Sequence, residues 1–373
     1  MPRFDVTIHT PEHLRNFSYV LAGLFDLEHR GVVATRVRLD ARLHQRGQLT
    51  ARCDVRDRMS GRSAVVLFDT KDSPDSILPV HWQTADVIFK RSFEPACVER
   101  VVPPEQRHKV MPMGLFLNAR SRHEHHLYMF FAGMAAHALR NADWLGSGSL
   151  RRRVLSPINQ DFVQRVIEYR TLPFVDEHVA PPPADTEPLV LFQTRAFPAY
   201  PADPPEFLAS KSLVNAQRAD LIRRLRAALG SRFVGGLVPD AFARRHFPDV
   251  LTTLPTDPGR YRELVRRARV VVYSAGLVGS AARKLAEYLA AGRAIVMQRL
   301  PTTLPAPLED GRHALVFDDA EACVARCREL LDDAPRARAL GEAAAAYYRE
   351  WVEPATNVER MIGLAMAHRA PAR

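Results

Sequence analysis

The sequence predicts an α/β protein with parallel sheets, organised as two domains. Short apolar runs with strand character alternate with longer amphipathic stretches along most of the chain, a pattern typical of strand–helix–strand units. The stiff, polar run Ala180-Pro-Pro-Pro-Ala-Asp-Thr-Glu-Pro188 interrupts this alternation and has the composition of a linker. A chain of 373 residues is long enough for two domains with separate cores.

The first domain is expected over residues 1–180. It begins with a predicted strand at Phe4–His9, followed by an amphipathic helix at 12–30 that ends before Gly31. The remaining strands are predicted at 32–39, Ser63–Asp69, 85–89 and 109–113, and helical stretches at 123–140 and 159–169. Residues 181–188 form the predicted linker.

The second domain is expected over residues 189–352 and repeats the alternation. A predicted strand at 189–193 precedes a helix at Pro205–Leu229, which stops at Gly230. The remaining strands are predicted at 232–236, 269–273, Ala294–Gln298 and 314–317, with helices from Asp319 onward. Ligands of open α/β sheets bind at the carboxyl ends of the strands, so chemistry is expected there.

The most informative segment lies between residues 269 and 298, where a strand, a small-residue turn, a helix and a second strand follow one another. The turn contains Gly276, Leu277, Gly279 and Ser280. A glycine-bearing turn that opens a helix leaves free backbone N–H groups at the positive end of the helix dipole. Such an end suits a phosphate group.

The helix predicted at 281–291 has one apolar and one polar side. At about 100° per residue, Ser280, Lys284 and Glu287 fall on the same side. An ammonium can bind phosphate, and a carboxylate can accept hydrogen bonds from ribose hydroxyls. By itself the pattern is more typical of an ordinary surface helix after a buried strand, and a nucleotide diphosphate site is the functional alternative.

The run from Gly276 to Val296, Gly-Leu-Val-Gly-Ser-Ala-Ala-Arg-Lys-Leu-Ala-Glu-Tyr-Leu-Ala-Ala-Gly-Arg-Ala-Ile-Val, resembles the donor-nucleotide segment of bacterial GT-B glycosyltransferases of the family 1/4-like type. These enzymes move a sugar from a nucleotide sugar to an acceptor. Shorter pieces that begin at Asp86, Lys109, Leu191 and Arg232 are similar to the same group in the same order.

The resemblance implies the GT-B fold, in which two Rossmann-like domains face a central cleft. It also implies that the segment 353–373 contains a helix, near 356–367, that crosses back onto the first domain. Arg195, which directly follows the strand predicted at 189–193, is expected to neutralise the departing diphosphate. Lys211 and Arg218 lie on the next predicted helix, and neither is expected individually to bind the donor.

One position departs from the family pattern. Many retaining members carry a second glutamate eight residues before the ribose-binding one, and here that position is Gly279. The resemblance therefore does not carry a retaining mechanism over to this chain, and inversion at the anomeric carbon is preferred.

An inverting transfer needs a base in the first domain that takes the proton of the acceptor hydroxyl. Asp69 and Asp72 follow a predicted strand at its carboxyl end, although aspartates are also common in turns. His9 and His13 follow the first strand and open the first helix. Some inverting members of the family keep a catalytic histidine at this place, and His13 is the preferred candidate of the two. The choice between these side chains stays open.

Lys90 and Arg91 close another strand of the first domain. Their cations are expected to meet an anionic acceptor or the donor phosphates, and the alternative is a solvated strand end.

No metal site is expected. The cluster Arg122-His123-Glu-His125-His126 lacks the spacing that places all its ligands on one helical face. The sequence also contains no Asp-x-Asp, the pair with which metal-dependent glycosyltransferases of the other main fold bind their nucleotide. We expect no cofactor, since the nucleotide sugar is a substrate.

The net charge of +10 comes almost entirely from arginine, and the only lysines are Lys71, Lys90, Lys109, Lys211 and Lys284. A basic surface suits anionic lipid headgroups or a polyanionic acceptor, and no nucleic-acid-binding signature is present. No apolar run reaches the roughly 20 residues that span a bilayer, and the N-terminus does not resemble a signal peptide. We expect a cytoplasmic protein, loosely held at the inner face of the membrane.

The sequence thus predicts a metal-independent glycosyltransferase that acts on a nucleotide-sugar donor and on the hydroxyl of a glycan, lipid-linked or other acceptor, in bacterial glycan or glycoconjugate synthesis. A sugar-nucleotide epimerase of the same fold is one alternative. A non-catalytic nucleotide- or polyanion-binding partner in polysaccharide assembly is the other.

Overall fold

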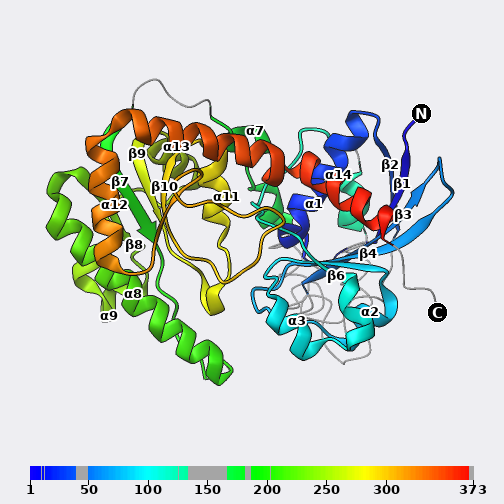
Figure 1. The fold of residues 1–373 in the computed structure, drawn as a ribbon, viewed down its shortest axis with the longest axis horizontal. Coiled ribbons are helices and arrows are strands. Elements are labelled where there is room, and N and C mark those ends of the chain that lie inside the picture. Colours follow the sequence, from blue (N-terminus) through cyan, green and yellow to red (C-terminus); the bar gives the residue numbers. More distant parts are fainter. Residues whose placement is uncertain are drawn as a thin grey trace, which may run out of the picture. The chain divides into compact units, whose positions relative to one another are not determined.

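The computed structural model describes residues 1–368 except 10, 12, 39–48, 125, 133–165, 181–185 and 202. The chain divides into two compact units, which Figure 1 shows as ribbons. Unit 1 comprises Met1–Val175 and Glu353–Arg373, and unit 2 comprises Asp176–Val352. Each unit has its own sheet and its own hydrophobic core.

Unit 1 is built around a six-stranded sheet in the order β2-β1-β3-β4-β5-β6. Its described elements are β1 (Phe4–His9), α1 (Leu14–His29), β2 (Val33–Arg38), β3 (Thr50–Asp57), β4 (Ser63–Asp69), α2 (Pro79–Thr84), β5 (Val87–Lys90), α3 (Pro95–Val101), a 3-10 turn (Pro104–Lys109), β6 (Val110–Pro112) and α14 (Pro354–Ala367). The predicted strands Phe4–His9 and Ser63–Asp69 are confirmed to the residue.

Strand β3 corrects the expectation of a wholly parallel sheet. It pairs antiparallel with both β1 and β4, and the sequence analysis did not predict it. Its signal was present, because Ala51, Cys53 and Val55 are buried and alternate with half-buried polar residues, the period of a strand with one covered face.

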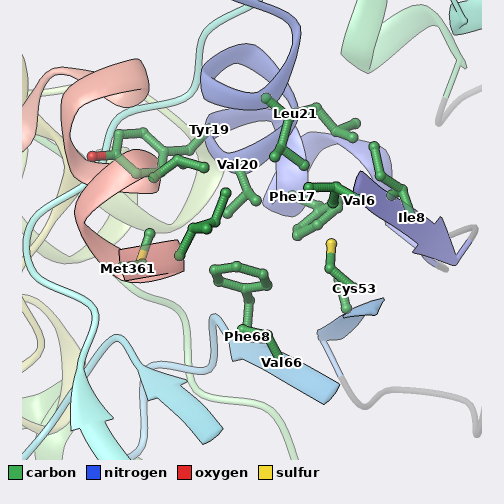
Figure 2. Packing of buried hydrophobic residues seen from close by; sticks show 14 of the residues in the cluster. Val6, Ile8, Phe17, Tyr19, Val20, Leu21, Cys53, Val66, Phe68 and Met361 are labelled. Atoms are coloured by element: carbon green, nitrogen blue, oxygen red, sulfur yellow. The ribbon is translucent and has the colours of Figure 1, made fainter. Parts of the chain in front are cut away.

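The core of unit 1 joins the sheet to two helices that are distant in the sequence (Figure 2). Phe17 of α1, Phe68 of β4 and Met361 of α14 are all buried in it, and the rings of Phe17 and Phe68 lie 5.8 Å apart. Helix α14 (red in Figure 1) packs along α1 (blue). At their closest approach, a Cβ on Gly23 would lie 2.4 Å from the carbonyl oxygen of Pro354, so only glycine fits there.

Unit 2 is built around a five-stranded sheet in which every pairing is parallel. Its described elements are α7 (Val175–His178, at the boundary), β7 (Glu187–Thr194), α8 (Pro205–Leu229), β8 (Phe233–Leu237), α9 (Ala241–His246), α10 (Pro258–Arg267), β9 (Ala268–Tyr273), α11 (Arg283–Ala290), β10 (Ala294–Gln298), β11 (Leu315–Phe317), α12 (Ala320–Asp332) and α13 (Ala334–Tyr347). Short helical turns occupy Gly230–Arg232, Pro248–Val250 and Leu277–Gly279, and a π-helical turn occupies Tyr348–Val352.

The predicted helix Pro205–Leu229 and strand Ala294–Gln298 are confirmed. Helix α8 ends at Gly230, whose φ of +54° is readily adopted by glycine. Helices α8 and α12 share one core with alternate residues of the strands, while α10 and α11 also contact β9. Central strand β9 reads Ala-Arg-Val-Val-Val-Tyr and is buried over Val270–Tyr273, as expected for a parallel strand covered on both faces.

The strand order of unit 2 fixes where a ligand would bind. Read from the other edge, the order is β8-β7-β9-β10-β11, which is the 2-1-3-4-5 order of a doubly wound sheet. The chain changes direction across the sheet between β7 and β9. Ligands of such sheets bind outside the carboxyl ends of the two strands at this switch point.

Within the part of the chain that the structure describes, no helix combines the length and the hydrophobicity needed to cross a membrane.

Candidate functional site

The candidate site lies at the carboxyl ends of β7 and β9. Arg195 is the first residue after β7, and Ser274 is the first after β9. The turn that carries Gly276, Leu277, Gly279 and Ser280 follows directly, and α11 with Lys284 and Glu287 begins three residues later. The predicted donor-binding residues therefore share the switch point of one sheet.

The turn after β9 is a closed loop and not the first turn of α11. The Gly276 N–H donates to the Ser280 carbonyl at 2.8 Å, and the Ser280 N–H donates to the Leu277 carbonyl at 3.0 Å. The Val278 N–H donates to Ser210 Oγ of α8 at 2.8 Å. We expected all these amides to be free at the helix end. Among the described residues, those of Leu277 and Gly279 have no partner outside the turn.

The backbone of this turn is strained. Val278 has a φ of +47°, an outlier for a β-branched residue, and such strain concentrates at functional sites. Gly279 has a φ of +74°, and a Cβ there would lie 2.5 Å from Cγ of Pro301. The position eight residues before Glu287 is therefore shaped for glycine here.

Lys284 holds a central position in the site. Its Nζ donates to the Gln193 carbonyl oxygen near the end of β7 and, at 3.0 Å, to the hydroxyl of Tyr261. Burial lowers the pKa of Lys284 to about 7, against the opposing effect of Glu287, and the nearby Arg218 and Arg195 lower it further. This amine can therefore change its charge near neutral pH.

Arg218 of α8 connects the loop that follows β7 to the loop that follows β9. Its guanidinium donates to Ser274 Oγ at 3.2 Å, to the Arg195 carbonyl at 2.7 Å and to the Ala275 carbonyl at 3.1 Å. The side chain is buried, and burial lowers its pKa to about 10, still well above neutral pH. The sequence analysis did not assign this arginine to the site individually.

Two further polar residues of α8 fix the loop after β7. Asn215 accepts from the Phe197 N–H at 2.8 Å and donates to the Phe197 carbonyl at 2.9 Å. Lys211 donates to the Pro198 carbonyl at 3.0 Å and to Asp203 at 2.6 Å. Together with Arg218 these residues form a buried polar stripe at helical spacing, a sequence signal that could have identified them.

Arg195 and Glu287 carry the two charged groups of the site that no other described residue binds. Arg195 is exposed and Glu287 is half-buried. In the described part of the chain, neither side chain makes a hydrogen bond or an ion pair. A guanidinium and a carboxylate are thus available to a ligand at the same strand ends.

In unit 1, the structure places Asp69 and Lys90 inside the protein, whereas we expected both at an opening. They are partners in the register of β4 and β5, their side chains are fully buried, and Asp69 Oδ2 lies 3.3 Å from Lys90 Nζ. Lys90 also donates to Ser76 Oγ at 3.0 Å. Burial lowers the pKa of Lys90, and the Asp69 carboxylate partly offsets this effect.

Asp72 and Arg91 lie nearby and form a second ion pair. The Arg91 guanidinium is buried over the ring of Phe116, 4.6 Å from its centroid, while Asp72 is exposed. Of the two predicted aspartates, Asp72 is the one that reaches solvent.

His13 occupies the N-cap position of α1. It borders a small hollow together with Asn16, Thr50 and Thr70. His9 lies at the end of β1 with its side chain buried, and its Nε2 is 2.9 Å from Asp54 Oδ2. The two histidines therefore differ, since His13 lines a hollow and His9 is engaged inside the sheet.

The histidine cluster after Arg122 lies partly outside the described residues, because position 125 is not described. His123 stacks on His29 with ring centroids 3.6 Å apart, and His126 lies 3.7 Å from Glu28. Over the described ranges, no group of three or more His, Cys, Asp or Glu side chains is placed to hold a metal ion. The four cysteines are buried and free.

Comparison with known families gives one match. Residues 216–363 match the family model described as glycosyl transferase-like. The matched range contains most of α8, continues through the turn and α11, and ends within α14. No curated protein sequence matches the chain.

Solved structures resemble the chain only distantly. Sucrose-phosphate synthase from Thermosynechococcus elongatus is 17% identical over 40% of this chain and 42% of its own, with a TM-score of 0.32. HepE from Anabaena in complex with UDP is 10% identical over 97% and 99%, with a TM-score of 0.36. A glycosyltransferase from Rickettsia africae is 11% identical over 77% of each chain, with a TM-score of 0.36.

The chain spans 42% of the synthase and also 42% of TarM, another of the solved structures that it resembles.

Proposed function

We propose that this chain, whose residues 216–363 match the glycosyl transferase-like family model, transfers a sugar from a nucleotide-sugar donor to an acceptor hydroxyl. The observation that carries the proposal is the set of cations at the switch point of unit 2. Arg195, Arg218 and Lys284 gather at the ends of β7 and β9 with Glu287 as the nearby carboxylate.

These groups suit a nucleoside diphosphate. Arg195 and the Leu277 and Gly279 amides offer donors that the described protein does not use elsewhere, and phosphate oxygens accept such bonds well. Lys284 adds a cation at the strand end. Glu287 lies nearly one helical turn beyond Lys284, where its free carboxylate would accept from ribose hydroxyls.

The proposed reaction is a single displacement that inverts the anomeric carbon. The acceptor oxygen forms the new glycosidic bond while the bond from the anomeric carbon to the diphosphate breaks, and the electrons of that bond leave with the diphosphate. Its growing negative charge is stabilised by Arg195 and Lys284, so we propose that the site needs no metal ion. Inversion agrees with a glycine at position 279, where a second carboxylate does not fit.

In an inverting transfer, the acceptor hydroxyl gives its proton to a base. We propose His13 for this role and keep Asp72 as the second candidate. His13 lines a hollow and carries an imidazole, whose ordinary pKa suits proton transfer near neutral pH. Asp72 already accepts from Arg91, and Asp69 is enclosed with Lys90.

The test is a turnover assay over a panel of UDP-, GDP-, ADP- and dTDP-sugars with mixed glycan and lipid-linked acceptors. Release of the nucleoside diphosphate together with a glycosylated acceptor supports the proposal. Glu287→Ala should raise the KM for the donor about tenfold or more, the loss of one or two hydrogen bonds to ribose. A donor KM unchanged in Glu287→Ala removes this residue from the proposed site.

Two other outcomes identify the alternatives. Isomerisation of the sugar nucleotide without an acceptor indicates an epimerase. Binding of the nucleotide without turnover indicates a non-catalytic partner in polysaccharide assembly, a candidate favoured by the enclosure of Asp69 and by the glycine at position 279.

A further inference from the structure

Tyr261 of α10 contacts two residues of α11 with one hydroxyl group. The hydroxyl lies 3.0 Å from Lys284 Nζ and 2.6 Å from the hydroxyl of Tyr288. Lys284 and Tyr288 are four residues apart on α11 and therefore share one face of the helix. Tyr261 and Tyr288 are both buried, so the three groups form a chain that leads from the site into the protein.

The Lys284 amine is fixed by three contacts from two elements, α10 and β7. Its Nζ lies 4.1 Å from the centroid of the Tyr261 ring, it donates to the Tyr261 hydroxyl, and it donates to the Gln193 carbonyl of β7. A cation over an aromatic ring is attracted by the ring's negative face. These contacts hold the amine at the strand end beside Arg195.

We propose that Tyr261 is a positioning residue that holds Lys284 in both of its protonation states, and that Lys284 takes up a proton from water when a nucleoside diphosphate binds. The choice of a nucleoside diphosphate as the ligand rests on the proposed function. The role of Tyr261 rests on its contacts with Lys284 and Tyr288.

The paired hydroxyl groups of Tyr261 and Tyr288 fit both protonation states of Lys284, because each hydroxyl can either donate or accept a hydrogen bond. When Lys284 is an ammonium, its N–H donates to the Tyr261 oxygen, and the Tyr261 hydroxyl donates to Tyr288. When Lys284 is a neutral amine, Tyr288 donates to Tyr261, and the Tyr261 hydroxyl donates to the amine nitrogen. The distances fit either direction. The Lys284–Tyr261 and Tyr261–Tyr288 hydrogen bonds are thus kept in both states.

The charges around the amine favour a proton change on binding. Arg218 of α8 and Arg195 after β7 repel the ammonium, and Glu287 of α11 attracts it. The other titratable groups that face it are the phenols of Tyr261 and Tyr288, whose pKa values are raised by burial so that both stay neutral. With burial, these charges leave the pKa of Lys284 at about 7. A diphosphate adds negative charge and raises that pKa.

The experiment follows the five lysines of the chain by NMR, with ¹³C at their Cε positions. Lys284→Met identifies the Lys284 signal by its absence. In the ligand-free protein, this signal should titrate with a midpoint near pH 7. Tyr261→Phe keeps the ring and removes a hydroxyl whose hydrogen bond is stronger to the charged ammonium than to the neutral amine, so the midpoint should fall by about 0.5 to 1 pH unit.

Tyr347→Phe is the matched control, because its hydroxyl donates to the Ala306 carbonyl away from Lys284, and the midpoint should stay. Equal midpoints in the wild-type protein and Tyr261→Phe overturn the role of Tyr261. Should Tyr261→Phe not fold, Tyr288→Phe replaces it. The loss of the second hydroxyl should lower the midpoint by a smaller amount, and an unchanged midpoint again overturns the inference.

The second arm adds UDP, GDP or ADP to the same sample. Binding should raise the Lys284 midpoint by at least one pH unit, and binding that leaves the midpoint in place overturns the proton uptake. If none of the nucleotides binds while Tyr261→Phe still shifts the midpoint, the role of Tyr261 stands and the proposed nucleotide function fails.

Discussion

Asp69 and Lys90 face each other across the paired strands β4 and β5, with both side chains fully buried and 3.3 Å between Asp69 Oδ2 and Lys90 Nζ. Asp69 Oδ1 also accepts from the Lys71 N–H at 3.0 Å, and Lys90 also donates to Ser76. This pair anchors the loop that follows β4, which carries Asp72 at the surface.

Removing only one charge of the Asp69–Lys90 pair should strongly destabilise the protein. Asp69→Asn or Lys90→Met leaves the other charge buried and unpaired, and each should lower the free energy of unfolding by about 3 to 5 kcal/mol. The double variant Asp69→Asn with Lys90→Met should cost less than the sum of the two. Urea unfolding measures all three, with Arg100→Ala, from the exposed pair Arg100–Asp75, as a control that should cost about 1 kcal/mol or less. Losses below 1 kcal/mol for both single variants would contradict the burial of this pair.

His81 should make unit 1 less stable in mild acid. It is buried, and burial lowers its pKa from the ordinary value to about 4, while the neighbouring Asp69 opposes this. The unfolded chain binds a proton at His81 below about pH 6.5, and the folded chain does so only near pH 4. The contribution of His81 to stability is therefore complete above pH 6.5 and falls as the pH drops toward 4.

Urea unfolding at pH 7.5, 6.0 and 5.0 measures this effect. The slope between pH 6 and 5 should approach about 1 kcal/mol per pH unit from this residue, and His81→Asn should lose that part of the slope. An equal slope in the variant would contradict the burial of a neutral imidazole.

Substitutions at three glycines distinguish the cost of a steric clash from the cost of a left-handed backbone conformation. Gly279→Ala meets both a φ of +74° and Pro301, and it should cost about 2 to 4 kcal/mol. Gly311→Ala meets a φ of +81° in open space and should cost about 1 kcal/mol. Gly363→Ala lies within α14 with nothing near its Cβ, and it should stabilise by about 0.5 to 1 kcal/mol. A different ranking in thermal unfolding would show that the turn after β9 is not shaped as described.

Arg218 should be needed for the shape of the site. Arg218→Met removes the donors to Ser274 and to the Arg195 and Ala275 carbonyls, and it should lower the free energy of unfolding by about 2 to 4 kcal/mol. Nucleotide binding, measured by thermal shift, should be lost with it. Arg224→Met is a control on the same helix, since Arg224 is exposed and, among the described residues, forms an ion pair with Asp220 alone. Its cost should be within about 0.5 kcal/mol. If the two variants behave alike, Arg218 does not hold the loops.

Sequence patterns predicted the parts of the fold that depend on local periodicity. The long helix Pro205–Leu229 has a proline at its start and a glycine after its end, and the parallel strands of unit 2 are short apolar runs. Strand β3 was missed although Ala51, Cys53 and Val55 alternate with charged residues. Its antiparallel pairing depends on strands elsewhere in the chain, which no local pattern specifies.

For the site, too, sequence patterns predicted the local features but not the contacts between distant residues. The spacing of Lys284 and Glu287 on one helix pointed to their neighbourhood. The contacts of Arg218 with Ser274 and Ala275 join residues 56 and 57 positions apart, so they follow from packing and not from spacing. Asp69 was expected at an opening because it ends a strand. Its burial depends on Lys90, 21 residues later, whose position opposite Asp69 is set by the register of the sheet.

Calorimetric titration of UDP, GDP and ADP into the wild-type protein, Arg195→Met and Arg224→Met tests the donor site at the switch point most directly. We expect one nucleotide to bind the wild-type protein and Arg224→Met equally, and to bind Arg195→Met at least tenfold more weakly, which corresponds to about 1.4 kcal/mol for a lost charge-assisted contact. Equal affinity in all three proteins, or no binding of any nucleotide to the wild type, would contradict a diphosphate site at the ends of β7 and β9.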